Sequence, residues 1–158
     1  MPTPIVPVAI ALGSNLGDRR AHLDYAAGRL SEILADVRIS PYIETEPFGV
    51  ASQPLYLNAA VVGLTGESPS SLLAELLRIE QERERARPYR GAPRTLDLDL
   101  ILYGDSVIAG PDLEIPHPRF RDRPFVLEPL AAIAATMVDP VTGLTVIELL
   151  QRCSRGTE

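Results

Sequence analysis

Two aspartates, Asp97 and Asp99, alternate with leucines in the stretch 94–100 (RTLDLDL). On a β-strand, side chains two residues apart share one face, which places the two Cα atoms about 7 Å apart. Carboxylates at this spacing can bind hard cations, and Mg²⁺ commonly takes one or two protein carboxylates together with substrate phosphates. The alternative is a strand face exposed to solvent, which antiparallel sheets often have.

Arginine accounts for all fifteen residues of the Lys and Arg count, and eight of these arginines crowd into the windows 83–94 and 119–123. The absence of lysine excludes a Walker-A lysine, a Schiff base and a lysine general base. Such local positive charge suits a small polyanionic ligand, whereas the net charge of −6 argues against a general nucleic-acid binder. Alternatively, Glu80, Glu82 and Glu84 interleave with the first window, as in a surface helix with weak ion pairs.

Three further segments carry polar or aromatic groups that could bind a ligand. Tyr56 and Asn58 share a strand face and could stack on a flat ring and pair with its edge, or simply cover the sheet. His117 lies between two prolines beside an arginine and could hold a phosphate or ribose, or only cap a turn. The stretch 13–17 indicates a tight turn without either nucleotide fingerprint, and His22 is expected to be structural.

The hydrophobic pattern predicts the elements that must position these residues. Asp18 is expected to cap a helix that continues through Leu34, and Ser68-Pro69 to open a helix that ends before Pro88. Strands are predicted at 5–12, 37–44, 56–64 and 95–103, a short strand pair at 107–115, and further helices at 125–135 and 146–152. The order βαββαβ is typical of a ferredoxin-like α+β sandwich, with helices on one face of an antiparallel sheet, followed by a helical tail.

Length and composition set broad limits on the class of protein. A chain of 158 residues fits one domain, and its 46% hydrophobic residues are typical of globular proteins. The single cysteine excludes an internal disulfide, and with only two histidines a Cys/His zinc cage is excluded. Apolar runs stay well short of the ~18 residues of a membrane span, and the start lacks a basic signal-peptide region. We therefore expect a cytoplasmic protein without membrane contact.

Five segments in this order resemble one family across nearly the whole chain: 11–18 (ALGSNLGD), 56–60 (YLNAA), 93–99 (PRTLDLD), 116–119 (PHPR) and 123–130 (RPFVLEPL). They resemble the 6-hydroxymethyl-7,8-dihydropterin pyrophosphokinases, whose signature is PRTLDLD. The resemblance implies a single pyrophosphokinase domain over 1–158. It implies transfer of pyrophosphate from ATP to the pterin hydroxymethyl group, with release of AMP, as a step in tetrahydrofolate biosynthesis.

The resemblance also implies a role for each matching residue. Two Mg²⁺ ions would be held by Asp97 and Asp99, and these aspartates with Arg85 and Arg94 would form the catalytic group. The pterin would be bound by Gly13, Thr45, Glu46, Phe48, Tyr56, Asn58 and Phe125. ATP would be bound by Glu80, Arg87, Arg90, Leu100, Leu113, His117, Arg121 and Arg123.

Three other interpretations remain open. A ferredoxin-like module could bind a small ligand without chemistry, but simple binding needs no acidic pair beside loop arginines. An RNA-binding sheet would want basic charge and an aromatic-rich central strand, and this chain has neither. A different two-metal nucleotide transferase would be excluded by pterin binding. We expect a monomer whose partners are ATP and the dihydropterin.

Overall fold

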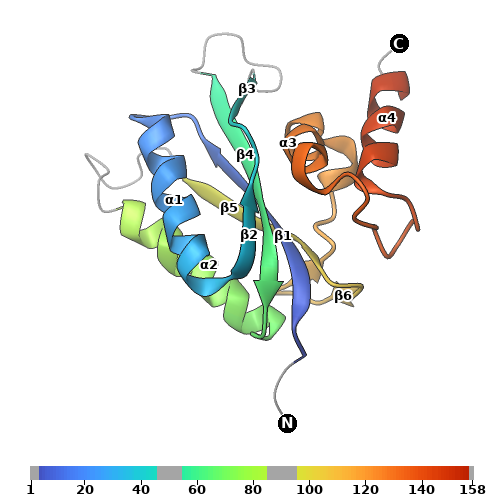
Figure 1. Ribbon diagram of the computed structural model, residues 1–158, viewed down its shortest axis with the longest axis horizontal. Coiled ribbons are helices and arrows are strands. Elements are labelled where there is room, and N and C mark those ends of the chain that lie inside the picture. Colours follow the sequence, from blue (N-terminus) through green and yellow to red (C-terminus); the bar gives the residue numbers. More distant parts are fainter. Residues whose placement is uncertain (1–3, 46–54, 85–95, 157–158) are drawn as a thin grey trace.

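The computed structural model describes residues 4–45, 55–84 and 96–156, and these form an antiparallel sheet with helices on both faces (Figure 1). The strands are β1 (Val6–Ser14), β2 (Ala35–Ile39), β3 (Ile43–Thr45), β4 (Tyr56–Thr65) and β5 (Asp97–Tyr103). Their order is β2-β4-β1-β5, with β3 also paired to β4, and neighbouring strands run antiparallel. The predicted ferredoxin-like sandwich is confirmed, and the C-terminal helices, which were predicted only as a tail, cover the second face of the sheet.

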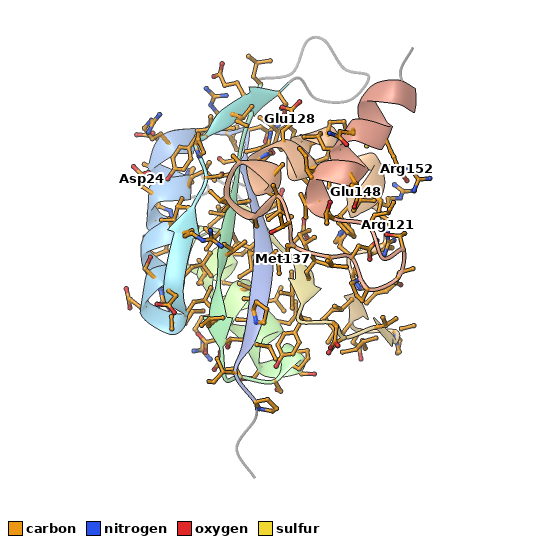
Figure 2. All side chains as sticks on the ribbon, turned by 45° about the vertical axis from the view of Figure 1, so that its right-hand side comes forward. Asp24, Arg121, Glu128, Met137, Glu148 and Arg152 are labelled. Carbon is orange, nitrogen blue, oxygen red and sulfur yellow. The ribbon has the colours of Figure 1, made fainter. Side chains whose placement is uncertain are left out.

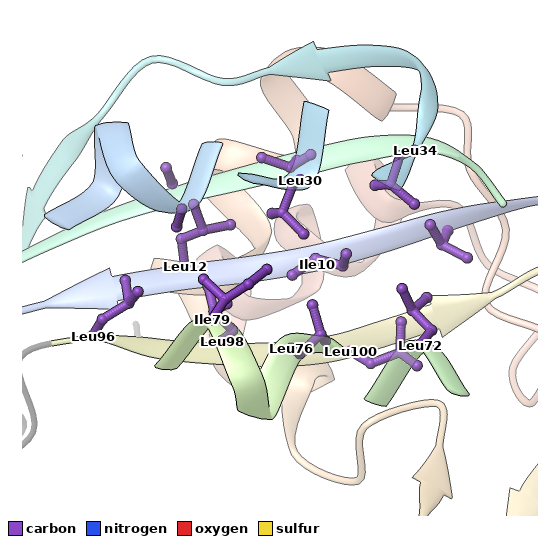
Figure 3. Packing of buried hydrophobic residues seen from close by; sticks show 14 of the residues in the cluster. Ile10, Leu12, Leu30, Leu34, Leu72, Leu76, Ile79, Leu96, Leu98 and Leu100 are labelled. Carbon is purple, nitrogen blue, oxygen red and sulfur yellow. The ribbon is translucent and has the colours of Figure 1, made fainter. Parts of the chain in front are cut away.

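Helices α1 (Arg19–Ile33) and α2 (Pro69–Glu84) cover one side of the sheet, which we call the α1 face. Both begin where their sequences predict, because Asp18 Oδ1 accepts a hydrogen bond from Ala21 N at 3.1 Å and Ser68 Oγ accepts one from Ser71 N at 3.2 Å. Leucine and isoleucine side chains from the helices pack against Ile10 and Leu12 of β1 (Figure 3). This packing forms the larger of the two hydrophobic cores seen among the described residues.

Helices α3 (Pro124–Ala134) and α4 (Val146–Gly156) cover the opposite side, the α3 face, so the sandwich has three layers (Figure 1). The residues of β1 that point this way are Ala9 and Ala11, and their small side chains leave room for Phe120 from a short 3₁₀ helix, η1 (Phe120–Asp122). The predicted short strand pair is confirmed as β6 (Ile108–Ala109) and β7 (Glu114–Ile115). None of the helices in the described ranges has the length and apolar character needed to cross a membrane.

The predicted strand 37–44 is wrong in one respect, because the structure divides it into β2 and β3. Pro41 has no N–H to donate, and Ser40 turns its side chain onto β4 instead. Ser40 N donates to Ala60 O at 2.9 Å, and Ser40 Oγ accepts from Ala60 N at 2.8 Å. Within β2, Asp36 has a positive φ of 50° and the pairing register with β4 shifts there. The edge of β4 is therefore covered by two short strands rather than one long strand.

Candidate active site

The candidate site lies at one end of the α3 face, where three strands bring their polar residues side by side. Asp97 is paired with Gly13, and Asp99 with Ala11, across β1 and β5. Gly13 is also paired with Asn58 of β4. Because Ala11 belongs to the core on the α3 face, its cross-strand partner Asp99 points the same way. Asp97, two residues earlier, shares that direction.

The acidic pair is half-buried, and the leucines between its members are buried on the other side of the strand. Leu98 and Leu100 are each 5% exposed and belong to the core on the α1 face. The predicted alternation of faces is therefore confirmed. Among the described residues, no three His, Cys, Asp or Glu side chains gather as a metal cage. Two carboxylates on one strand face fit a cation that completes its shell with phosphate oxygens and water.

Gly13, Asn58 and Tyr56 form a floor beside the acidic pair. Asn58 is 5% exposed, and its Nδ2 donates to Thr45 Oγ1 at 2.5 Å. A Cβ added to Gly13 would lie 3.3 Å from Asn58 Oδ1 and 4.0 Å from a ring carbon of Tyr56. The lack of a side chain at Gly13 therefore leaves space in front of an amide whose orientation is fixed by Thr45.

The start of α3 provides an aromatic ring from the layer that covers this face. Phe125 is 36% exposed, and the guanidinium carbon of Arg123 lies 5.6 Å from the centre of its ring. Pro124 occupies the first turn of α3, where its missing N–H costs no hydrogen bond. Since α3 packs on β3 and β4, Phe125 belongs to the layer facing the strands that carry Thr45 and Tyr56.

His117 follows the cis Ile115–Pro116 bond and lies along the outer edge of β5. Its backbone N donates to Ile101 O at 3.0 Å, and its Nδ1 accepts from Arg119 N at 3.3 Å. Burial lowers the pKa of His117 and outweighs the opposing effect of the Asp99 carboxylate, which favours the neutral ring. In the neutral ring, Nδ1 accepts and the proton is on Nε2, which makes this nitrogen a hydrogen-bond donor on the side of Asp99.

Four residues assigned to ATP by resemblance have side chains engaged elsewhere. Leu100 is buried in the core on the α1 face, and Leu113 packs against that core. Glu80, on α2, is 5% exposed, and its Oε2 accepts from Leu98 N at 2.7 Å. Arg121 lies beside α4 (Figure 2). Their roles in nucleotide binding stay predictions.

The guanidinium of Arg121 makes a bidentate ion pair with a fully buried carboxylate. Its Nε and NH2 donate to the two oxygens of Asp139 at 2.5 Å and 3.0 Å. Val141 N and Thr142 Oγ1 donate to the same carboxylate at 3.0 Å and 2.7 Å. Arg121 therefore ties η1 to the turn that precedes α4.

Six of the predicted site residues lie outside the described ranges: Glu46, Phe48, Arg85, Arg87, Arg90 and Arg94. The assignments of these residues to pterin, phosphate and nucleotide binding remain predictions.

A polar cluster between α1 and α2 is a feature that sequence reasoning missed, although it expected His22 to be structural. The Nε of Arg83 donates to His22 Nδ1 at 3.0 Å, and its guanidinium carbon lies 4.7 Å from the ring centre of Tyr25. Tyr25 donates to Glu82, which pairs with Arg29 at 2.9 Å. Burial, and then the charge of Arg83, lower the pKa of His22. The helical spacing of positions 22, 25 and 29 is the signal that could have indicated this cluster.

Comparison with known proteins identifies the family. The family model described as 7,8-dihydro-6-hydroxymethylpterin-pyrophosphokinase matches residues 9–135. A 2-amino-4-hydroxy-6-hydroxymethyldihydropteridine pyrophosphokinase of Synechocystis is 42% identical over 146 residues, which cover 90% of this chain and 74% of that protein. The protein of the same name from Pseudomonas aeruginosa is 40% identical over 149 residues, covering 92% and 91% respectively.

A solved structure supports the same conclusion at the level of the fold. A crystal structure of HPPK-DHPS from Plasmodium falciparum superimposes with a TM-score of 0.81 at 15% sequence identity. The match covers 99% of this chain, which spans 47% of the Plasmodium chain. At that identity the likeness shows the fold alone. The family model and the two relatives show that the chain belongs to the 7,8-dihydro-6-hydroxymethylpterin-pyrophosphokinase family.

Proposed function

We propose that the site on the α3 face transfers pyrophosphate from ATP to the hydroxymethyl group of 6-hydroxymethyl-7,8-dihydropterin. Membership of the family assigns pyrophosphokinase activity in folate biosynthesis. The observation that carries the placement is that Asp97 and Asp99 share one sheet face with Gly13 and Asn58. This arrangement puts groups suited to phosphates next to groups suited to a flat polar ring.

The pterin side of the site follows from the chemistry of the ring. A pterin is flat and carries hydrogen-bond donors and acceptors along its edge. Asn58, oriented by Thr45, offers an amide to that edge, and Gly13 leaves the space that a ring needs. Tyr56 and Phe125 supply aromatic surface from the sheet and from α3.

The ATP side depends on positioning and charge. The hydroxymethyl oxygen bonds to the β-phosphorus, while the bond between the β-phosphorus and the α,β-bridging oxygen breaks. AMP leaves with the bridging oxygen, and the hydroxyl proton passes to solvent. Asp97 and Asp99 would hold two Mg²⁺ ions, whose charge, when bound, offsets that of the phosphates. His117 and Arg123 add donors on the same side, and Arg85 and Arg94 are proposed to bind the phosphates. Such a transfer needs alignment and neutralisation more than covalent help.

The same proposal covers the extent of the domain, the location of the protein in the cell, its oligomeric state and its partners. We infer a single pyrophosphokinase domain over residues 1–158, acting as a cytoplasmic monomer. ATP and the dihydropterin are its partners, without nucleic acid or membrane. The runner-up is a ferredoxin-like module that binds a small ligand without turnover.

The decisive experiment measures nucleotide products from ATP and Mg²⁺ with and without 6-hydroxymethyl-7,8-dihydropterin. Pterin-dependent AMP without ADP supports the proposal. ADP formation would instead mean ordinary phosphoryl transfer, and tight pterin binding without any turnover would favour the binding module.

A further inference from the structure

Glu80 is a buried carboxylate that reaches the backbone between the two aspartates of the site. It lies on α2, on the α1 face, whereas Asp97 and Asp99 point to the α3 face. Its Oε2 accepts a hydrogen bond from Leu98 N at 2.7 Å. The side chains of Ile79 and Leu76, also from α2, pack close to Leu98 in the same region (Figure 3).

This hydrogen bond occupies an open edge of the sheet. Among the described strands, β5 pairs with β1 in this sheet and lies at its end, so backbone groups on the other side of β5 need partners from elsewhere. Leu98 N finds a charged acceptor, and hydrogen bonds to a carboxylate are roughly twice as strong as those between neutral groups. The backbone of residues 97–99 is therefore fixed on one side by strand pairing with β1 and on the other by the hydrogen bond from Leu98 N to Glu80.

We propose that Glu80 is a positioning residue for the acidic pair, acting through the Leu98 N–H rather than by contact with the nucleotide. Two like charges on one short strand segment repel each other, and a fixed backbone keeps their carboxylates ready to receive metal-bound phosphates. Groups that orient metal ligands commonly change metal affinity when they are replaced. This inference rests on the proposed function, because it takes Asp97 and Asp99 as the metal ligands.

Two conservative substitutions distinguish the effect of the length of the Glu80 side chain from the effect of its charge. E80Q keeps the chain length and an acceptor oxygen but loses the charge, whereas E80D keeps the charge and withdraws the oxygens by one methylene. E82A is the matched control, because it removes a carboxylate from the same helix that contacts Arg29 and Tyr25 instead of β5. Urea denaturation verifies that each variant is folded under the conditions of the measurements.

The readouts are hydrogen exchange of the Leu98 amide by NMR and Mn²⁺ binding by EPR with a non-hydrolysable ATP analogue. We expect E80D to speed Leu98 exchange and to weaken Mn²⁺ binding about tenfold or more. E80Q should keep the Leu98 amide protected and bind Mn²⁺ within about threefold of the parent, since a neutral oxygen still accepts the bond. E82A should match the parent in both measurements.

Three results would overturn the inference. The first is weaker binding of Mn²⁺ and the ATP analogue in E80Q than in E80D, while the Leu98 amide stays protected from exchange in both variants. Glu80 would then act through its charge on the ligand. The second is unchanged Mn²⁺ binding in E80D when D97N abolishes it, which would leave the proposed function standing. If D97N also binds Mn²⁺ normally, the metal site of the proposed function fails, and this inference fails with it.

Discussion

Replacing Gly13 by alanine adds a methyl group to the floor of the proposed pterin pocket. The new Cβ would lie 3.3 Å from Asn58 Oδ1, so Asn58 must give way by a few tenths of an ångström. That movement strains its 2.5 Å hydrogen bond with Thr45. A weakened hydrogen bond together with overpacking costs roughly 1–2 kcal/mol. We therefore expect the G13A variant to bind pterin about 5- to 30-fold more weakly.

Steady-state AMP formation gives KM for each substrate, and calorimetry gives pterin affinity in the absence of ATP. The expected result is a loss confined to the pterin, with KM for ATP within about twofold of the parent because the methyl contacts Asn58 and Tyr56. G28A is the matched control, since a Cβ on Gly28 would meet nothing within 4 Å beyond its chain neighbours and the backbone of its own helix, and alanine stabilises a helix interior by up to about 1 kcal/mol. Unchanged pterin affinity in G13A, or an equal loss for ATP, would refute the assignment of this floor to the pterin.

Three further predictions follow from charged groups. D97A should lower kcat at least about 10²-fold with an unchanged circular dichroism spectrum. The control D112N, at an exposed carboxylate, should keep the parent kcat. A kcat near that of the parent in D97A would contradict the metal assignment. D139A should lower the free energy of unfolding in urea by about 3 kcal/mol, because Arg121 loses its buried partner but keeps some access to water; a loss near zero would show that the pair is not stabilising. Burial and then the Arg83 guanidinium lower the pKa of His22 in the folded protein, so the unfolded chain binds a proton at His22 more tightly. The contribution of neutral His22 to stability is complete above the usual pKa of 6.5 and is lost as pH falls below that value. H22Q should therefore show a smaller loss of stability from pH 7 to 5 than the parent, and an identical slope would contradict the shifted pKa.

Local patterns predicted the parts of the fold that depend on near neighbours in the sequence. The caps at Asp18 and Ser68 need only residues three positions away, and both form as expected. The shared face of Asp97 and Asp99 follows from the twofold alternation of a strand, which the buried leucines beside them confirm. These features were accessible because a few covalently linked residues determine them.

Contacts between distant segments could not be predicted from local sequence patterns. The pairing of Arg121 with Asp139 joins residues eighteen positions apart, and no local period indicates it. The bond from Leu98 N to Glu80 is equally hidden, because a backbone N–H has no sequence signature. The break at Pro41 shows a related limit. A strand was predicted over 37–44, but the proline and the turn of Ser40 onto β4 divide that stretch into two strands.

The two outer edges of the sheet bear on how copies of this chain behave when they meet. An unpaired strand edge is a template for another chain, and proteins often interrupt it with bulges or cover it. In β2, the positive φ of Asp36 disturbs the regular succession of backbone groups. Along β5, Leu98 N donates to Glu80, and Ile101 O accepts from His117 N. Strand-to-strand growth is thus hindered at both sides, and the protein should resist forming extended sheets even at the high concentrations used for structural work.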